Sequence, residues 1–281
     1  MPDPNRLLVT LRRAVQAVRG QTGRHGRVLH LDLAAEVLVA GDLHGNLENF
    51  KRLLDRAQLA GHPARHLVLQ EIIHGPFHYP DGRDKSHQLV DLLAALTCQF
   101  PYQVHLLLGN HELAQWTGQR IGKGDEDCND LFRLGVATAY QARAEDIYAG
   151  YLELFAACPF AIRTANRVFL SHSLPSSKRL DQFDLAVLTR DEQSDADLRW
   201  GGSVHSLLWG RDPSPANVAA FLQKVDADWL ITGHIPCERG FDAPNERQII
   251  LDAGSAPACY CLFPADRPVT QHDLLEGVGI L

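Results

Sequence analysis

The sequence has no CxxC pair, no long hydrophobic run and few aromatic residues. Its six cysteines are spread over 281 residues, which excludes a small disulfide-built scaffold and argues against a zinc ribbon, so we expect reduced thiols in a cytoplasmic protein. No segment approaches the roughly 20 apolar residues needed to cross a bilayer. Residues 1–20 mix arginines with short apolar pieces and lack a secretory signal, so we expect no membrane association.

The charge balance restricts which partners the chain can bind. The chain carries 27 basic and 34 acidic residues, a formal charge of −7, which argues against a general nucleic-acid-binding surface.

With 45% hydrophobic and 22% charged residues, the composition is typical of a globular enzyme with a full-sized core. We expect one domain over residues 1–281, with an N-terminal helical extension at 1–27 and a helical insertion at 113–157. The 14 histidines are more than usual, and imidazole is a common transition-metal ligand.

Hydrophobic periodicity predicts strands that alternate with helices. Apolar residues at helical spacing predict an opening helix over residues 7–18 and another after Asn46, which can cap it. Short apolar or alternating runs predict strands at residues 28–33, 36–40, 66–73, 104–108, 161–163, 167–170, 229–232, 248–252 and 258–263. The strands at 161–163 and 167–170 are expected to form a hairpin. The alternation from 36 to 108 is that of an α/β sheet covered by helices, in which sites form at the carboxyl ends of strands.

Asp42 and His44 follow the predicted strand at 36–40. In an extended segment, residues two apart point the same way, so this carboxylate and this imidazole can bind one cation. Gly41 and Gly45 allow a tight turn around them. The alternative is a loop in which Asp42 caps the next helix and His44 is incidental.

Asn110 and His111 follow the next predicted strand but one, at 104–108. An Asn carbonyl oxygen is a suitable hard ligand, and the adjacent imidazole, which points elsewhere, can act as a general acid. Asn is also a favoured turn and cap residue, and a lone His after a strand is most often a core residue. His172 and His234, however, occupy matching positions after two further apolar runs. Four strand ends with such side chains favour one shared metal site.

Five motifs in this order resemble those of one enzyme family. They read GDLHGN at 41–46, GNHE at 109–112, LSHSLP at 170–175, LLWG at 207–210 and ITGH at 231–234. They resemble the calcineurin-like metallophosphoesterases, and the later ones resemble the serine/threonine phosphoprotein phosphatase branch. The resemblance spans roughly residues 28–263. It implies an α/β fold, a layered β-sandwich flanked by helices, with the active site at the carboxyl ends of the strands.

The resemblance also implies a catalytic site with two divalent metal ions, Mn²⁺ in the first place and otherwise Fe or Zn. By position, the first ion would bind Asp42 and His44, and the second would bind Asn110, His172 and His234. His111 would protonate the leaving group. Such ions lie roughly 3.5–4 Å apart and activate the water that attacks the phosphorus. The substrate would be a phosphomonoester, of a protein or of a small molecule.

One family motif is replaced in this sequence. The family places GDxxDRG after the second strand, which supplies a bridging aspartate, an aspartate that orients the catalytic histidine and a phosphate-binding arginine. Here the stretch at 70–76 reads QEIIHGP. Glu71 offers a carboxylate that is one methylene longer and can bridge the metals. His74 replaces the orienting aspartate, and Gly75 replaces the arginine.

Other residues would then have to supply the missing functions. We expect Asp81 or Asp84 to orient His111, and Arg83 or Arg211 to contact phosphate. His74 is a further candidate for a phosphate contact or an additional metal ligand.

Three rival functions remain open at this point. A phosphodiesterase or a dinucleoside polyphosphate hydrolase would use the same site. A phosphate-binding module with weakened catalysis is favoured by the altered stretch and opposed by His111. A zinc hydrolase of amides or lactams would carry an HxHxDH cluster, which the sequence lacks.

Overall fold

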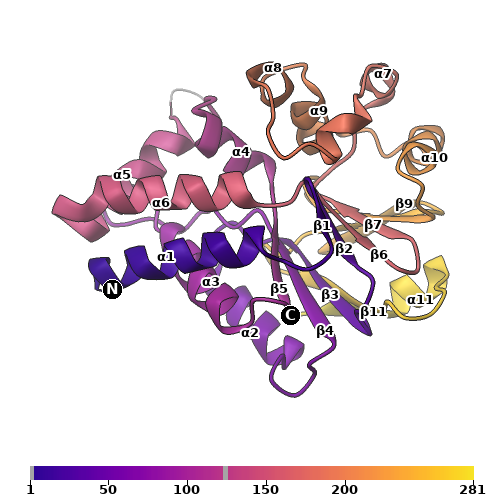
Figure 1. Cartoon of the computed structure of the whole chain (residues 1–281), viewed down its shortest axis with the longest axis horizontal. Coiled ribbons are helices and arrows are strands. Elements are labelled where there is room, and N and C mark those ends of the chain that lie inside the picture. The colour runs from indigo at the N-terminus through magenta and orange to yellow at the C-terminus, as the bar shows by residue number, and fades with distance from the viewer. Residues whose placement is uncertain (1–2, 123–125) are drawn as a thin grey trace.

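Two β-sheets pack face to face, and helices cover their outer sides (Figure 1). The computed structural model describes residues 3–122 and 126–281. Among these residues, none of the helices combines the length and the apolar character required to cross a bilayer.

The smaller sheet contains the first two predicted site strands. It has five strands in the order β12-β11-β3-β4-β5. β3, β4 and β5 run parallel, and β11 pairs antiparallel with both β3 and β12. The bounds of these strands are Glu36–Asp42 for β3, Arg65–Gln70 for β4, Val104–Leu107 for β5, Cys259–Pro264 for β11 and Val278–Ile280 for β12.

The larger sheet contains the later site strands. It has seven strands in the order β1-β2-β6-β7-β8-β10-β9. β6 and β7 form the predicted antiparallel hairpin, and β7, β8 and β10 run parallel. The bounds are Arg24–His25 for β1, Val28–Leu31 for β2, Ala161–Thr164 for β6, Val168–Ser171 for β7, Trp229–Thr232 for β8, Phe241–Asn245 for β9 and Gln248–Leu251 for β10.

Alternation along β3 explains how the layers stack. Val37 and Val39 face the second sheet, where they join a buried cluster with Ile231 and Ile249. Leu38, between them, belongs to the larger core under the helices. Because successive side chains of a strand point to opposite faces, one strand contributes to both cores. The two sheets therefore fix each other's position, and with it the position of their strand ends.

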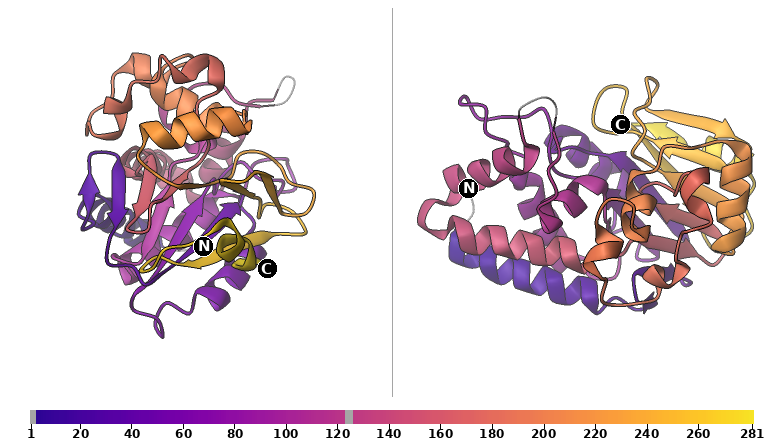
Figure 2. Two further views of the ribbon diagram at one scale, coloured as in Figure 1. Left: turned by 90° about the vertical axis from the view of Figure 1, so that its right-hand side faces the viewer. Right: turned by 90° about the horizontal axis from the view of Figure 1, so that it is seen from above.

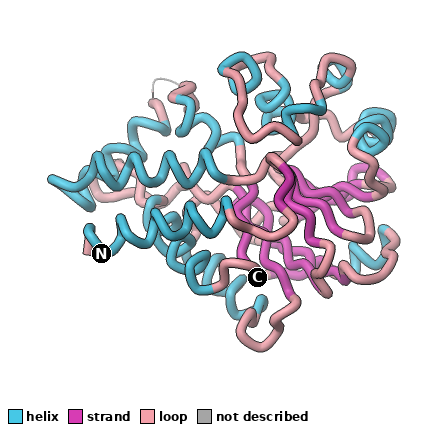
Figure 3. Tube along the Cα trace, in the orientation of Figure 1, coloured by secondary structure: helices cyan, strands magenta, loops and turns pink. Residues whose placement is uncertain are grey.

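Long helices form a layer against the smaller sheet. α1 (Pro4–Arg19) packs against α3 (His87–Gln99) and α6 (Ala144–Ala157), and α6 also packs against α4 (Asn110–Thr117) and α5 (Cys128–Tyr140). Figure 2 shows α1 and α6 side by side in the view from above. Figure 3 shows these helices extending beyond the strands on one side of the molecule.

A buried carboxylate connects three of these helices. Asp91 of α3 accepts hydrogen bonds from the hydroxyl groups of Tyr140 on α5 and Tyr151 on α6. Burying a carboxylate costs free energy unless it is hydrogen-bonded. The two tyrosine hydroxyl groups therefore stabilise Asp91 in the helical layer.

The other helices are mostly short. They are α2 (Leu47–Ala57), α7 (Ser177–Leu180), α8 (Asp195–Leu198), α9 (Ser203–Trp209), α10 (Pro215–Lys224) and α11 (Gln271–Glu276), with 3-10 turns η1 (Gln141–Arg143) and η2 (Leu185–Leu188). Asn46 caps α2 as expected, because its side chain accepts a hydrogen bond from Asn49 N at 3.0 Å.

Most predicted elements are present, with bounds that differ by a few residues. β3 continues to Asp42 instead of residue 40, and α4 begins at Asn110 instead of 113. The predictions missed β1, α7, α9, α11, β9 and β12. α9 is buried on almost every side, so it shows no helical stripe. Residues 123–125 of the predicted insertion lie outside the described part of the chain.

The hydrogen bonds to Asp91 lead to a stability prediction. We expect Tyr151→Phe to lower the free energy of unfolding by about 1–3 kcal/mol, since it removes one hydrogen bond from a buried carboxylate. Tyr102→Phe is the matched control, because Tyr102 is 67% exposed. Urea unfolding followed by circular dichroism measures both; equal midpoints for the two variants would contradict the role of Asp91.

Candidate metal centre

The carboxyl ends of strands from both sheets meet at one cavity. β3, β4 and β5 supply it from one sheet, and β7, β8 and β10 from the other. Asp42 at the end of β3 pairs with Asp252 beyond β10, which joins the two sheets at this point. The cavity has a volume of about 670 Å³, and its lining includes Glu71, Asn110 and His234.

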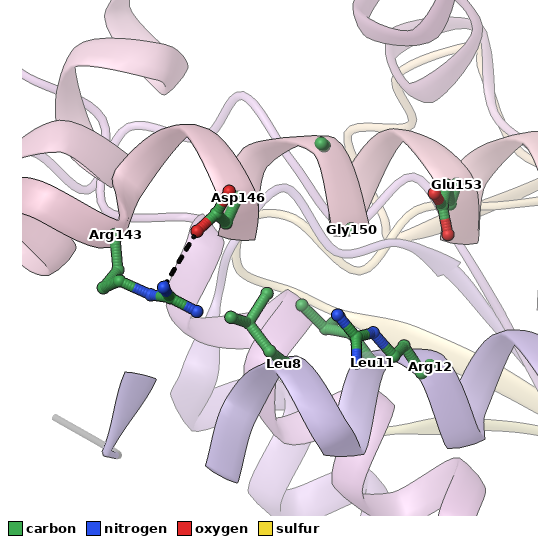
Figure 4. Close-up of a pocket in the computed structure, with 8 residues that line it drawn as sticks. Leu8, Leu11, Arg12, Arg143, Asp146, Gly150 and Glu153 are labelled. Atoms are coloured by element: carbon green, nitrogen blue, oxygen red, sulfur yellow. Dashed lines mark ion pairs between the residues drawn. The ribbon is translucent and has the colours of Figure 1, made fainter. Parts of the chain in front are cut away.

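A second hollow lies in the helical layer, between α1 and α6 (Figure 4). It measures about 220 Å³. Its charged lining includes Arg12, Glu153 and an ion pair of 3.3 Å between Arg143 and Asp146. The described residues that line it include no histidine or cysteine, so we place the functional site at the strand ends.

Glu71 lines the cavity and faces three histidines. Its Oε1 lies 3.3 Å from His44 Nε2 and 3.7 Å from His111 Nε2. Its Oε2 lies 3.0 Å from His172 Nε2. The two oxygens of one carboxylate therefore face ligand atoms from different parts of the chain, as a bridging ligand must.

Second hydrogen bonds determine which nitrogen of each histidine is free. His44 Nδ1 donates to the carbonyl oxygen of Ile73 at 3.0 Å, which leaves Nε2 with its lone pair. His172 Nδ1 lies 3.0 Å from Gln70 Oε1, and the Gln70 amide group donates to Ala40 O. Because that contact fixes the amide direction, Oε1 is the acceptor and His172 Nε2 is also unprotonated. Such partners commonly hold metal-binding histidines in place.

Asn110 and His234 complete the group beside Glu71. Asn110 Oδ1 lies 2.8 Å from His172 Nε2 and 2.9 Å from His234 Nδ1. Asn110 is the first residue of α4 and follows β5 by two residues. A helix start in this position turns its side chain toward the strand ends.

The chemistry of these donors fits cations. The Oδ1 atom of Asp42 is buried without a hydrogen-bond partner among the described residues, while its Oδ2 accepts from His234 N at 2.8 Å. Burial, and then the negative charge of Glu71, raise the pKa of Asp42 well above its usual value. Two sets, Asp42-Glu71-His172 and His44-Glu71-His111, each bring their ligand atoms within 4.8 Å of one another. A buried orphan carboxylate oxygen among unprotonated nitrogens is a suitable place for a divalent ion.

The backbone at the site is unusual. Positive φ angles occur at His44 (44°), Glu71 (44°), His74 (60°) and His234 (67°). For residues other than glycine such angles cost free energy and concentrate at functional sites. A Cβ atom at Gly75 would lie only 1.6 Å from the carbonyl oxygen of His44. The same tight path that directs Glu71 inward therefore excludes an arginine at position 75.

His111 has neighbours on both of its ring nitrogens. Its Nε2 faces Glu71, and its Nδ1 lies 2.9 Å from Nδ1 of His74. His74 Nε2 lies 2.7 Å from Gln115 Oε1. Burial, and then the charge of His111, lower the pKa of His74 to about 3, and burial lowers the pKa of His111 to about 4. His74, and not a carboxylate, is thus the neighbour of His111 Nδ1.

The remaining expected residues divide into two groups. Arg211 lines the cavity, and its Nε donates to His234 Nε2 at 3.0 Å. Asp84 also lines the cavity, but its carboxylate accepts hydrogen bonds from Ser86. Arg83 and Asp81 are absent from the described lining and pair with each other at 3.3 Å. The structure therefore gives neither Asp81 nor Asp84 a contact with His111, and it gives Arg83 none with the cavity.

The sequence patterns did not identify three residues that belong to the site. Gln70 and Gln115 contact the rings of His172 and His74, and Trp209 lines the cavity. Gln115 follows His111 by four residues, so one helical turn brings both to the same face of α4. That spacing was the available signal.

Comparison with solved structures shows the same fold in phosphatases. A protein serine/threonine phosphatase from Saccharomyces cerevisiae, with similarity to human phosphatase PP5, aligns with a TM-score of 0.70 at 15% identity, covering 100% of this chain and 89% of that one. A cold-active protein-tyrosine phosphatase of a psychrophilic Shewanella aligns with a TM-score of 0.62 at 18% identity, covering 89% and 80%. At these identities the likeness concerns the fold.

The family assignment comes from the sequence comparison. The family model described as calcineurin-like phosphoesterase matches residues 35–238, which include all six residues expected to bind metal. Members of this family hydrolyse phosphoesters with divalent metals, and the present cavity offers the groups to hold them. The chain belongs to the calcineurin-like phosphoesterases.

Proposed function

We propose that this chain hydrolyses phosphomonoesters, including those of phosphoproteins, with two divalent ions held on either side of Glu71. Mn²⁺ is the ion we propose first, because the ligands mix oxygen and nitrogen atoms. The observation that carries the proposal is the Glu71 carboxylate, whose two oxygens face His44 and His172 at 3.3 and 3.0 Å.

The proposed ligand sets combine the contacts of Glu71 with the positions of the family motifs, which assign Asp42 to the ion of His44. The first ion would bind Asp42, His44 Nε2 and Glu71 Oε1. The second would bind Glu71 Oε2, Asn110 Oδ1, His172 Nε2 and His234 Nδ1. When bound, the ions would supply Lewis acidity to the phosphate oxygens and an activated water as the nucleophile.

Residues of the chain itself would donate the proton and bind the organic part of the substrate. His111 has its Nε2 on the cavity side. As general acid it would first take up a second proton from solvent, and the Nε2 proton would then pass to the leaving oxygen, which returns the ring to its neutral form with the proton on Nδ1. The apolar lining beside it includes Leu131, Trp209 and Pro236. This wall offers room for the organic part of a phosphoester, and the named protein phosphatases of the same fold support a phosphoprotein as the substrate.

Arg211 is the residue we propose to contact phosphate. Its Nε–H donates to His234 Nε2, which requires that nitrogen to be unprotonated. An imidazole that binds a metal through Nδ1 carries its proton on Nε2, so this hydrogen bond would break when the second ion binds. Arg211 would then be free for a phosphate oxygen, for which its guanidinium group is well suited.

The activity itself is tested with p-nitrophenyl phosphate in Mn²⁺, followed by a phosphopeptide and a nucleotide. We expect Asp42→Asn to lower kcat on the order of 10²-fold or more, because the first ion loses its charged ligand. Asp55→Asn, on the exposed side of α2, is the matched control and should hydrolyse like the parent chain. Equal rates for the parent chain and Asp42→Asn would defeat the proposal.

Metal affinity tests the support of His172. We expect Gln70→Leu to weaken binding of Mn²⁺ by about 10–100-fold, since His172 loses the acceptor that fixes its ring. Gln21→Leu is the control, because Gln21 is also a buried glutamine but bonds to Val104 O, away from the cavity. Isothermal titration measures both. Unchanged affinity in Gln70→Leu, or an equal loss in both variants, would contradict this role.

A further inference from the structure

A chain of three side chains runs from the helical layer to the cavity. Gln115 Oε1 lies 2.7 Å from His74 Nε2, and His74 Nδ1 lies 2.9 Å from His111 Nδ1. All three come from elements that meet beside Glu71: Gln115 and His111 from α4, and His74 from the loop after β4. Gln115 is 2% exposed, so water does not compete for its amide group.

The direction of the Gln115 amide is fixed from behind. Its Nε2 lies 3.4 Å from the main-chain carbonyl oxygen of Asn129 and 2.7 Å from the hydroxyl of Tyr148. A carbonyl oxygen can only accept, so the NH₂ group must face Asn129. The amide oxygen therefore points at His74 and can only accept a hydrogen bond from it.

This direction determines the protonation of both imidazoles. His74 must carry its proton on Nε2 to donate to Gln115, which leaves its Nδ1 as an acceptor. A close contact between two Nδ1 atoms needs one proton, and His111 must supply it. Neutral His111 is therefore protonated on Nδ1, and its Nε2 is the nitrogen directed at Glu71.

We propose that Gln115 and His74 are positioning residues which together hold His111 with Nδ1 as donor and Nε2 toward the reacting phosphate. A glutamine-histidine pair would thus take over the orienting role that we expected of a carboxylate. This inference rests on the proposed function only for its catalytic consequence.

The surroundings hold His74 in this role. Its backbone N–H donates to Ser86 Oγ at 3.0 Å, and Ser86 in turn donates to Asp84 at 2.9 Å. The ring packs edge-on against Phe132, with centroids 5.8 Å apart. Asp84 thus acts on His74 through Ser86 and lies three contacts away from His111.

A double-mutant cycle separates this role from packing. In His74→Asp, the carboxylate has the same reach as the imidazole Nδ1, accepts without any help from Gln115, and suits the positive φ at this position. We expect Gln115→Leu to lower kcat for phenyl phosphate about 10-fold or more in the parent chain, with little change in KM, but less than about 2-fold in the His74→Asp chain. The loss should be smaller for p-nitrophenyl phosphate, whose leaving group needs no proton. An equal loss in both backgrounds, or none in the parent, would overturn the proposal.

¹⁵N NMR measures which ring nitrogen of His111 carries the proton, and it does not require catalytic activity. In the full chain labelled with ¹⁵N-histidine, without added metal and again with Mg²⁺, we expect His111 to show a protonated Nδ1 and an unprotonated Nε2, and Gln115→Leu to mix the two forms. Signals are assigned with His111→Asn. A protonated Nε2 in the parent chain, or no change in Gln115→Leu, would overturn the inference. If no phosphoester is hydrolysed at all, the proposed function fails and this measurement alone decides the inference.

Discussion

The buried carboxylate of Glu71 is the constraint on which the rest of the site depends. The residue is 2% exposed, and an ionised carboxylate removed from water costs several kcal/mol unless it is paired or hydrogen-bonded. The main-chain N–H of His111 donates to Glu71 Oε2 at 3.4 Å, and the rings of His111 and His172 lie beside the carboxylate. These histidines come from α4 and from the end of β7, so the site requires both sheets to be stacked in register. The core between the sheets thereby positions the candidate metal ligands.

The tight path of the chain around Glu71 accounts for several other features. Positive φ angles at Glu71 and His74 turn their side chains toward the cavity, and the close approach of Gly75 to His44 removes the space for a longer residue. Stability at such a place must come from elsewhere, and the Asp91 hydrogen bonds under the helices are one source. Without an arginine at position 75, Arg211 is the guanidinium group that lines the described part of the cavity.

Local signals in the sequence were enough for most of the strands and for the polar residues that follow them. Apolar runs that end in Asp42, Asn110 and His234 are readable because a strand and its following loop are close in sequence. The hydrogen bonds of Gln70 to His172 and of Gln115 to His74 could not be predicted from the sequence. These pairs are 102 and 41 positions apart, so their contacts depend on how the elements pack. The same limit explains why Asp81 and Asp84 were expected beside His111: their distance along the chain was suitable, but Arg83 and Ser86 already bind them. α9 was missed because burial on nearly all sides removes its periodicity.

Anomalous diffraction from crystals grown with Mn²⁺ tests the central claim most directly. We expect two peaks roughly 3.5–4 Å apart, with the Glu71 carboxylate between them, Asp42 and His44 on one ion, and Asn110, His172 and His234 on the other. A single peak, or peaks that Glu71 does not contact, would contradict it.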